Sequence, residues 1–348
     1  PGTRGVFMGL RRGVGNPFRP NVRFSLMTRL AMALFSLLRI PGSGYWGFHP
    51  AVKEIRRRLP EFPDFDAVLS NAIEPLPLAL FLAKRKPVFL DLHDYTPSHV
   101  EPGTRAGLFF GALKHWLYWK HVGQTATIFC PSQTMLRQLQ VDFPEIPSFV
   151  VRNVPEYNEI TASRAPERGI RLIHHGNPVR SRGILNMVEA LRHLPEPFSL
   201  HFMFEDRTPS WFNKTIREST VENRIFFHAP VAPEELPEKL SQFDVAIIWT
   251  QPSTRNNQMT LPGKLFESIH AGLAVVCSPI EDIAEVVRSK KLGLVGDSFS
   301  TEALTKVLTS LTKRDIDEFK ANSLDVAPDY DGKKEIEIIR DAIRKATE

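Results

Sequence analysis

The sequence has few of the residues and patterns that mark disulfide-stabilised or membrane-spanning proteins. Of its 348 residues only two are cysteines, and Cys130 and Cys277 each end an apolar run, far from one another. Such cysteines are typical of buried, reduced thiols. The apolar run at residues 30–38 is bounded by arginines and too short to cross a bilayer, and no signal peptide is apparent. We therefore expect a cytoplasmic protein.

Signatures of nucleic-acid recognition are also missing. The sequence has neither the cysteine and histidine spacing of zinc fingers nor the aromatic motif of RNA-binding sheets. Its 44 Lys and Arg residues are nearly matched by 39 Asp and Glu residues, which leaves a formal charge of +5. This charge favours an anionic partner such as a nucleotide or a phospholipid surface. We expect no nucleic-acid partner.

What the sequence has instead is a repeated alternation of short apolar strands with helices. In the first half, strands are predicted at residues 5–10, 65–70, 87–92, 125–130 and 148–152. After a segment without apolar periodicity, strands are predicted again at residues 170–174, 198–204, 225–228, 245–250, 274–277 and 292–295. The alternation is typical of parallel sheets covered by helices, so we expect an α/β protein.

The length of the chain and the break in the pattern indicate two domains. We place a first domain at residues 1–156, a linker at 157–169, a second domain at 170–325 and a C-terminal helix at 326–348. The repeated strands and helices predict that each domain is doubly wound and Rossmann-like.

Two predicted helices combine apolar or aromatic residues with basic ones. Residues 23–40 are apolar nearly all round and carry three arginines, and residues 108–122 include two tryptophans and two lysines. Burial in a domain core is one interpretation of these helices. Contact with an anionic membrane surface is the other, and we keep it as a secondary hypothesis.

The first loop of the second domain, residues 174–183, joins a strand to a helix. His174 and His175 are adjacent on the strand and point to opposite faces, so we expect no shared metal site. The loop offers glycine for close backbone approach, a helix N-terminus, and two arginines, Arg180 and Arg182, that suit phosphate oxygens. A solvated basic loop is the alternative interpretation.

A second loop, residues 251–260, follows a strand and leads into a helix that begins near Pro262. On this helix Lys264 and Glu267 stand three residues apart, close to the partial positive charge of the helix N-terminus. A phosphate group near Lys264 and sugar hydroxyls near Glu267 would suit this arrangement. An exposed ion pair of little energetic value is the alternative.

In a parallel sheet these two loops emerge at the same edge and can converge on one ligand. Arg182 and Lys264 would then hold a diphosphate, and Glu267 would accept hydrogen bonds from ribose hydroxyls. No metal is required, because fixed cations and a helix dipole can neutralise a leaving diphosphate. In the first domain, His93 and Asp94 follow a strand, where such sheets place their chemistry; a turn role for Asp94 fits equally well.

Together these segments resemble the retaining glycosyltransferases of the GT-B fold, in the large group called family 4 or glycosyl transferases group 1. The similar segments are residues 91–94, Pro131-Ser132, 176–183, 244–249, 261–267 and 271–276. Their order along residues 65–311 is the most specific part of the resemblance. It implies two Rossmann-like domains that face each other across a cleft, and a first domain that lacks its first strand–helix segment.

The resemblance also implies roles for individual residues. Arg182 occupies the family's lysine position at the donor diphosphate, Lys264 assists it, and Glu267 binds the ribose. His93, with Asp94 beside it, is the catalytic candidate and contacts the sugar or its phosphate. The remaining donor-binding residues are expected to be Gly176, Asn177, Thr260 and Leu261. Neither a metal nor a cofactor is implied, since the nucleotide-diphosphate sugar is the substrate.

The implied function is the transfer of a sugar to a cell-envelope, polysaccharide or lipid-linked acceptor, in the cytoplasm or at the inner face of the plasma membrane. Two residues depart from the family pattern: Met259 replaces a glutamate that binds the sugar, and Asn177 stands where arginine is common. These departures leave two alternatives open. One is a nucleotide-sugar epimerase of the same fold, and the other is a catalytically silent binding subunit.

Overall fold

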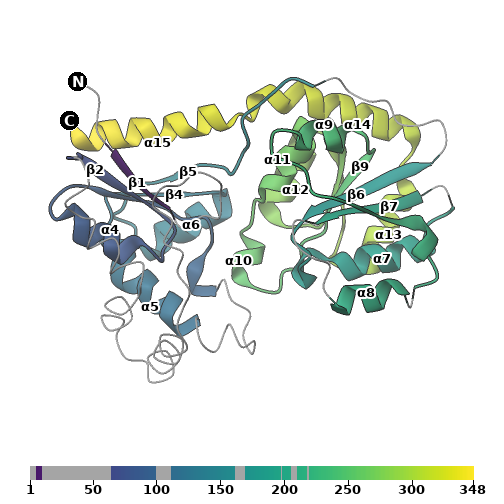
Figure 1. Ribbon diagram of the computed structural model, residues 1–348, viewed down its shortest axis with the longest axis horizontal. Coiled ribbons are helices and arrows are strands. Elements are labelled where there is room, and N and C mark those ends of the chain that lie inside the picture. Colours follow the sequence, from purple (N-terminus) through teal and green to yellow (C-terminus); the bar gives the residue numbers. More distant parts are fainter. Residues whose placement is uncertain are drawn as a thin grey trace. The chain divides into compact units, whose positions relative to one another are not determined.

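The computed structural model describes residues 5–9, 64–98, 111–160, 169–196, 198–204, 210–217 and 219–348. The basic helix predicted at residues 23–40 lies outside these ranges. The chain divides into two compact units (Figure 1). Unit 1 comprises Pro1–Val151, Thr254–Asn256 and Ile336–Glu348, and unit 2 comprises Arg152–Ser253 and Asn257–Glu335.

Unit 1 is built on a parallel sheet whose described strands follow the order β1-β2-β3-β4-β5. The strands are β1 (Gly5–Gly9), β2 (Ala67–Asn71), β3 (Val88–Asp91), β4 (Thr127–Cys130) and β5 (Ser148–Val150). Every residue of β4 is buried, as expected for a parallel strand that is covered on both faces. The strands predicted from the sequence are all present, with ends that differ from the prediction by at most two residues.

Helices cover both faces of the unit 1 sheet. Figure 1 shows α4 (Leu76–Ala83) and α5 (Ala112–His121) on one side and the C-terminal helix α15 (Gly332–Thr347) along the other. Ile339 and Ile343 of α15 pack against Phe89 and Phe129 of the sheet. A further helix, α6 (Gln133–Asp142), begins at Ser132, whose hydroxyl caps the helix by accepting a hydrogen bond from a backbone N–H in its first turn.

Unit 2 is built on a second parallel sheet, of order β11-β10-β9-β6-β7-β8. Its strands are β6 (Ile170–Gly176), β7 (Phe198–Phe204), β8 (Ile225–His228), β9 (Val245–Ile248), β10 (Ala274–Cys277) and β11 (Gly293–Val295). The chain winds outward from β6 to β8 and then returns to β9 on the other side of β6. The order therefore reverses between β6 and β9, and ligands of open α/β sheets bind beyond the carboxyl ends of strands at such a switch point.

The two faces of the unit 2 sheet carry different sets of helices (Figure 1). One face is covered by α7 (Ile184–His193), α8 (Ser210–Arg217) and α13 (Thr301–Ser310). The other is covered by α9 (Leu236–Ser241), α11 (Gly263–His270), α12 (Glu281–Ser289) and α14 (Lys313–Val326). Large apolar clusters lie between the sheet and each layer, and Trp249 is fully buried on the α7 side.

The sequence does not predict two of the helices that the structure describes. One is the single turn α10 (Arg255–Gln258) and the other is α14, a helix of 14 residues. The buried positions of α14 include Lys320 and Ser323. Lys320 donates a hydrogen bond to the backbone oxygen of Phe243, and Ser323 donates one to the backbone oxygen of Leu273. Polar side chains at these positions interrupt the apolar stripe of Ile316 and Phe319 by which an amphipathic helix is recognised.

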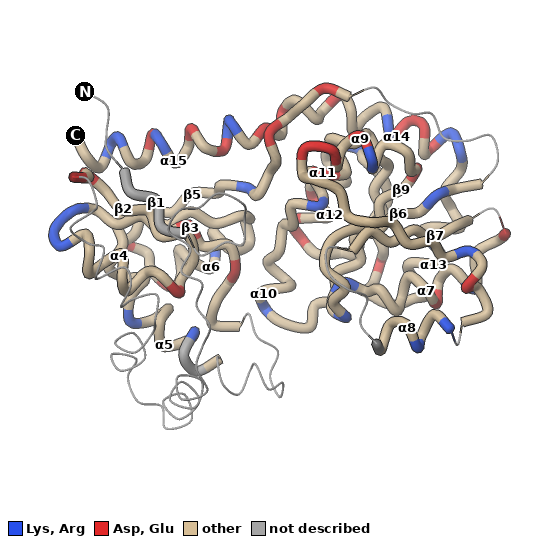
Figure 2. Tube along the Cα trace, in the orientation of Figure 1, with Lys and Arg blue, Asp and Glu red and all other residues tan. Residues whose placement is uncertain are grey.

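The described helices give no support for a membrane span, since none of them is both long and apolar enough. In α5, Trp119 is 48% exposed and belongs to an aromatic group with Tyr118 and Phe143. Figure 2 shows positive and negative residues interspersed along α15. This helix therefore does not present a surface of one sign to an anionic partner.

Candidate functional site

The carboxyl end of β6 places two histidines on opposite faces of the sheet, as the sequence predicts. His174 is fully buried; its Nδ1 donates a hydrogen bond to the backbone oxygen of Ile247 at 2.9 Å. His175 lies on the other face, where its Nε2 donates a hydrogen bond to Glu267 Oε2 at 2.8 Å. The two rings therefore point away from each other, and among the described residues no group of three or more His, Cys, Asp or Glu side chains is arranged as metal ligands.

Helix α11 brings Lys264 and Glu267 to this end of β6. The helix starts after Pro262, whose φ of −77° and ψ of 144° are those of an N-cap residue. Lys264, in the first turn, donates a hydrogen bond from Nζ to the backbone oxygen of His175 at 2.9 Å. Glu267, one turn later, reaches the ring of the same histidine. Both side chains of α11 therefore contact β6. The convergence of the two loops on one ligand stays a prediction.

Burial and neighbouring charges determine the protonation states of Glu267 and His174. Burial alone would raise the pKa of Glu267, but the hydrogen bond from His175 and the positive charge of Lys264 lower it overall, so the carboxylate is ionised at neutral pH. Burial lowers the pKa of His174 well below its usual value, and the charges of Lys264 and Arg182 act in the same direction. Lys264 and Arg182 thus both lie close to the neutral, buried ring of His174 at the switch point.

Two glycines shape the loop that joins β6 to α7. Gly176 has a φ of +100°, and a Cβ at this position would lie 3.3 Å from Lys264 Nζ. Gly183 has a φ of +70°, and a Cβ there would lie 2.2 Å from the backbone oxygen of Trp249, a distance that no side chain tolerates. Only glycine fits both positions without strain. The short 3₁₀ turn Arg180–Arg182 lies between them.

The other predicted donor-binding residues follow the two loops. Asn177 is exposed, Arg182 and Thr260 are half-buried, and Leu261 is buried. Met259, which replaces the family's first glutamate, is buried at 8% exposure. The two loops meet at one hydrogen bond, which the backbone N–H of Gln251 donates to the backbone oxygen of Ser181 at 2.8 Å. The proposed contacts of these residues with diphosphate, ribose and sugar stay predictions.

The predicted catalytic residues belong to unit 1. His93 follows β3, and its Nε2 donates a hydrogen bond to Asn71 Oδ1 at 2.5 Å and lies 3.2 Å from Asp91 Oδ2. Asp94 is exposed, and its backbone oxygen accepts a hydrogen bond from Thr96 Oγ1 at 3.2 Å. The histidine is therefore oriented by two residues at the ends of neighbouring strands. The backbone of Asp94 takes part in a turn, which is the alternative role considered for it.

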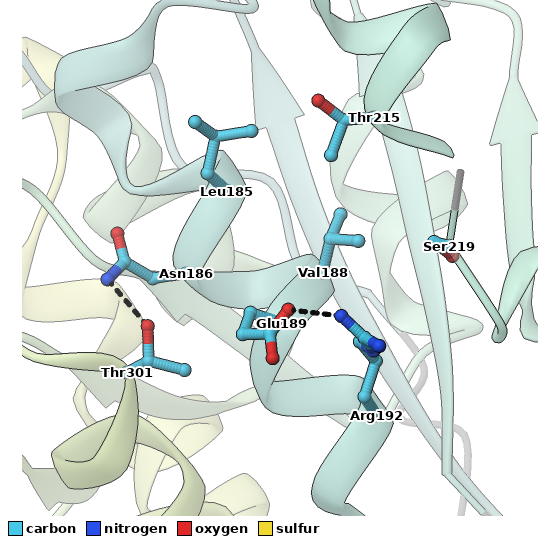
Figure 3. Close-up of a pocket in the computed structure, with 8 residues that line it drawn as sticks. All are labelled: Leu185, Asn186, Val188, Glu189, Arg192, Thr215, Ser219 and Thr301. Carbon is cyan, nitrogen blue, oxygen red and sulfur yellow. Dashed lines mark hydrogen bonds and ion pairs between the residues drawn. The ribbon is translucent and has the colours of Figure 1, made fainter. Parts of the chain in front are cut away.

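A hollow of about 470 Å³ lies elsewhere on unit 2, beside α7, α8 and the start of α13 (Figure 3). Four of its polar residues bond in pairs: Asn186 donates a hydrogen bond to Thr301 at 3.0 Å, and Arg192 donates one to Glu189 at 3.0 Å. Neither His175, Lys264 nor Glu267 lines it. The hollow is therefore not the site formed by β6 and α11.

Comparison with known proteins finds one family model that matches a part of the chain. Residues 169–314 match the family model described as glycosyl transferases group 1. The matched residues contain the end of β6, the loop to α7 and all of α11. No curated protein sequence matches the chain.

Solved structures of glycosyltransferases share the fold at low sequence identity. Sucrose-phosphate synthase of Thermosynechococcus elongatus is 12% identical, with a TM-score of 0.72, and the match covers 88% of this chain and 81% of that one. HepE of Anabaena, solved with UDP-glucose, is 14% identical, with a TM-score of 0.66 and coverages of 86% and 83%. The expected fold class is confirmed: α/β with parallel sheets, as in the GT-B glycosyltransferases.

TarM is similar over a smaller share of its length. It is 14% identical, with a TM-score of 0.60, and the match covers 80% of this chain but 54% of the TarM chain. The chain thus spans about half the length of this glycosyltransferase.

The sequence does not single out one member of the site. It suggests His175 only as a candidate metal ligand, whereas in the structure this residue is the hydrogen-bond partner of Glu267. The available signal was its place near the carboxyl end of a central parallel strand, where functional side chains gather.

Proposed function

We propose that the chain is a retaining glycosyltransferase that moves a sugar from a nucleotide-diphosphate donor to a cell-envelope, polysaccharide or lipid-linked acceptor. The observation that carries this proposal is the cluster at the switch point of unit 2. There an ionised Glu267 and the cation Lys264 both reach the end of β6, inside the domain that matches the glycosyltransferase family. A carboxylate suits ribose hydroxyls and an ammonium suits a diphosphate, so the two suit different parts of one nucleotide.

In this proposal, residues of the chain stabilise the negative charge of the leaving group. Lys264 and Arg182 offset the negative charge that develops on the leaving diphosphate, and the N-terminus of α11 adds partial positive charge. Glycine at position 176 lets phosphate oxygens approach the backbone closely. His93 orients the sugar, and a phosphate oxygen of the departing diphosphate takes the acceptor's proton. The proposal requires neither a side-chain nucleophile nor a metal.

The structural neighbours support a nucleotide-sugar donor. HepE was solved with UDP-glucose, and a pneumococcal O-GlcNAc transferase of the same fold, GtfA, was solved with UDP and GlcNAc. These ligands belong to those proteins. For this chain they make a nucleoside diphosphate the first class of ligand to test.

The test is calorimetric titration of the full chain with UDP, GDP, ADP and dTDP, followed by a donor-hydrolysis assay with the matching nucleotide sugars. We expect one nucleotide to bind and its sugar derivative to be hydrolysed. Glu267→Gln should weaken binding by roughly 10- to 100-fold, because a charge-assisted hydrogen bond contributes roughly 1.5–3 kcal/mol. Glu318→Gln is the matched control, since Glu318 is exposed on α14. A chain that binds none of the four nucleotides would refute the proposal.

A catalytically silent binding subunit is the second candidate, and Met259 is the observation that favours it. A buried thioether is only a weak hydrogen-bond acceptor, whereas a glutamate at this position would offer sugar hydroxyls two strong acceptor oxygens. Nucleotide binding without hydrolysis or transfer in the same assays would favour this candidate over the enzyme.

A further inference from the structure

We propose that His175 is a positioning residue, which aims the Glu267 carboxylate at the ribose hydroxyls of the bound nucleotide. The proposal rests on the proposed function, because it requires a nucleotide at this site. It assigns a role to a side chain of β6 that lies outside the donor-binding residues predicted from the sequence.

The first argument is the difference in burial between the two partners. The side chain of His175 is 6% exposed, whereas that of Glu267 is 31% exposed. Their hydrogen bond, 2.8 Å from Nε2 to Oε2, therefore joins a fixed, buried donor to a carboxylate that still reaches solvent. The histidine can hold the carboxylate in place without occupying the side from which a ligand would approach.

The second argument is the use of the two carboxylate oxygens. Among the described residues, His175 is the hydrogen-bond partner of Glu267, and it uses Oε2. Oε1 keeps its capacity to accept hydrogen bonds, and a carboxylate offers about four acceptor positions in all. A ribose presents two neighbouring hydroxyl donors. This geometry therefore favours an arrangement in which His175 holds Oε2 and the ligand hydroxyls bind Oε1.

The third argument is that His175 is itself held at two points. Lys264 donates a hydrogen bond to its backbone oxygen, and its ring donates to Glu267. Both partners come from α11, three residues apart, so the strand end and the helix are tied together by one residue. Movement of His175 would displace the ammonium and the carboxylate together, and so would disturb both halves of the proposed nucleotide site.

A purely structural role would not require a histidine here. The side chain of His175 is buried and its cross-strand partner on β7 is Met203, so an aromatic or aliphatic side chain would fill the position. Burying an imidazole N–H has a cost unless it is paired. Without the pairing, the flexible Glu267 side chain would be distributed over several rotamers and would lose entropy on binding a nucleotide.

The test compares ribose and deoxyribose nucleotides across variants of His175. The probe is the nucleoside diphosphate that binds the wild-type chain best, together with its 2′,3′-dideoxy form, both measured by calorimetry. We expect His175→Phe to weaken binding of the ribose form about tenfold and to leave binding of the dideoxy form nearly unchanged, because the lost interaction involves the hydroxyls. His175→Gln, which keeps an N–H donor, should recover most of the affinity.

His175→Asn is a second variant with an amide one methylene shorter than glutamine. It should behave like the phenylalanine variant, and it keeps the test decisive if the latter does not fold. His193→Phe, a change at an exposed histidine of α7, is the matched control. Equal losses for the ribose and dideoxy forms would overturn the proposal, and so would unchanged affinity in both His175→Phe and His175→Asn. A wild-type chain that binds nucleotide with no preference for ribose would refute the role of His175 while leaving the proposed function intact; a chain that binds no nucleotide would refute both.

Discussion

His93 shows how single residues prepare a site in unit 1. Its ring is held by Asn71 at the end of β2 and by Asp91 at the end of β3, so two strands determine its orientation. The residue after Asn71, Ala72, has a φ of +100°, a conformation that costs an alanine about 1–2 kcal/mol. Backbone strain of this kind is concentrated at functional sites, and here it lies next to the partner of the predicted catalytic histidine.

We predict that His93→Ala lowers turnover at least tenfold and leaves nucleoside diphosphate affinity within about twofold, because the residue acts on the sugar and not on the nucleotide. Steady-state kinetics with a donor and an acceptor, together with calorimetry, measure the two quantities. His115→Ala is the matched control, since His115 is exposed on α5. Full turnover in the His93 variant would show that the assignment is wrong.

At the scale of secondary-structure elements, the pairing of β7 with β8 brings two histidines into contact. Strands β7 and β8 bring His201 Nδ1 to 2.9 Å from His228 Nε2, and Ser199 Oγ lies 2.9 Å from the other ring nitrogen of His201. Burial lowers the pKa of His201 to about 4, with the charges of His228 and Arg171 acting in the same direction and Asp244 opposing them. The ring is therefore neutral in the folded chain at pH values where it is charged in the unfolded chain.

This difference predicts a pH dependence of stability. Between the unfolded pKa of about 6.5 and the folded pKa of about 4, the unfolded chain binds more protons, so the free energy of unfolding falls as the pH is lowered. We expect His201 to contribute about 1–2 kcal/mol to this loss, a value reduced for the partial exposure of the ring. Urea denaturation at pH 7.5 and pH 5 should show a smaller loss for His201→Gln than for the wild type. The exposed control, His193→Gln, should keep the wild-type loss, and identical losses in all three proteins would contradict the assignment.

Secondary structure was predictable where one local signal dominated. The bounds of β7 and β8 were predicted correctly, because apolar runs there are bounded by turn residues. Helix α14 was missed, because the contacts that hold Lys320 and Ser323 are made to Phe243 and Leu273, far away in the sequence. A lysine that pairs with a buried carbonyl looks like a surface residue until the fold is known.

At the scale of the whole molecule, unit 1 combines residues from both ends of the chain. Residues of α15 from Ile336 onward belong to it, and Ile339, Ala342 and Ile343 pack against its sheet. Ile336 on the same helix is 49% exposed. The last turns of the chain thus complete the apolar layer over strands that lie more than 200 residues earlier.

We therefore predict that Ile343→Ala lowers the stability of unit 1 by about 1–2 kcal/mol, the usual cost of removing part of a half-buried isoleucine. Differential scanning calorimetry would measure this as a lower unfolding temperature of that unit. Ile336→Ala provides the same chemical change on the same helix at an exposed position, and it should have little effect. An equal shift in the unfolding temperature from both substitutions would show that the packing of Ile343 against the sheet does not stabilise unit 1.

The sequence by itself determined the α/β class, the alternation of strands and helices, and the two loops where a ligand should bind, because these depend on local propensity and periodicity. It also indicated Lys264, Glu267 and Arg182 as members of one site, since parallel strands bring their carboxyl ends to one edge. Only the tertiary structure decided how they are held. His175 and Glu267 are 92 residues apart, and their hydrogen bond exists because β6 and α11 are brought side by side by the burial of apolar residues on both faces of the sheet.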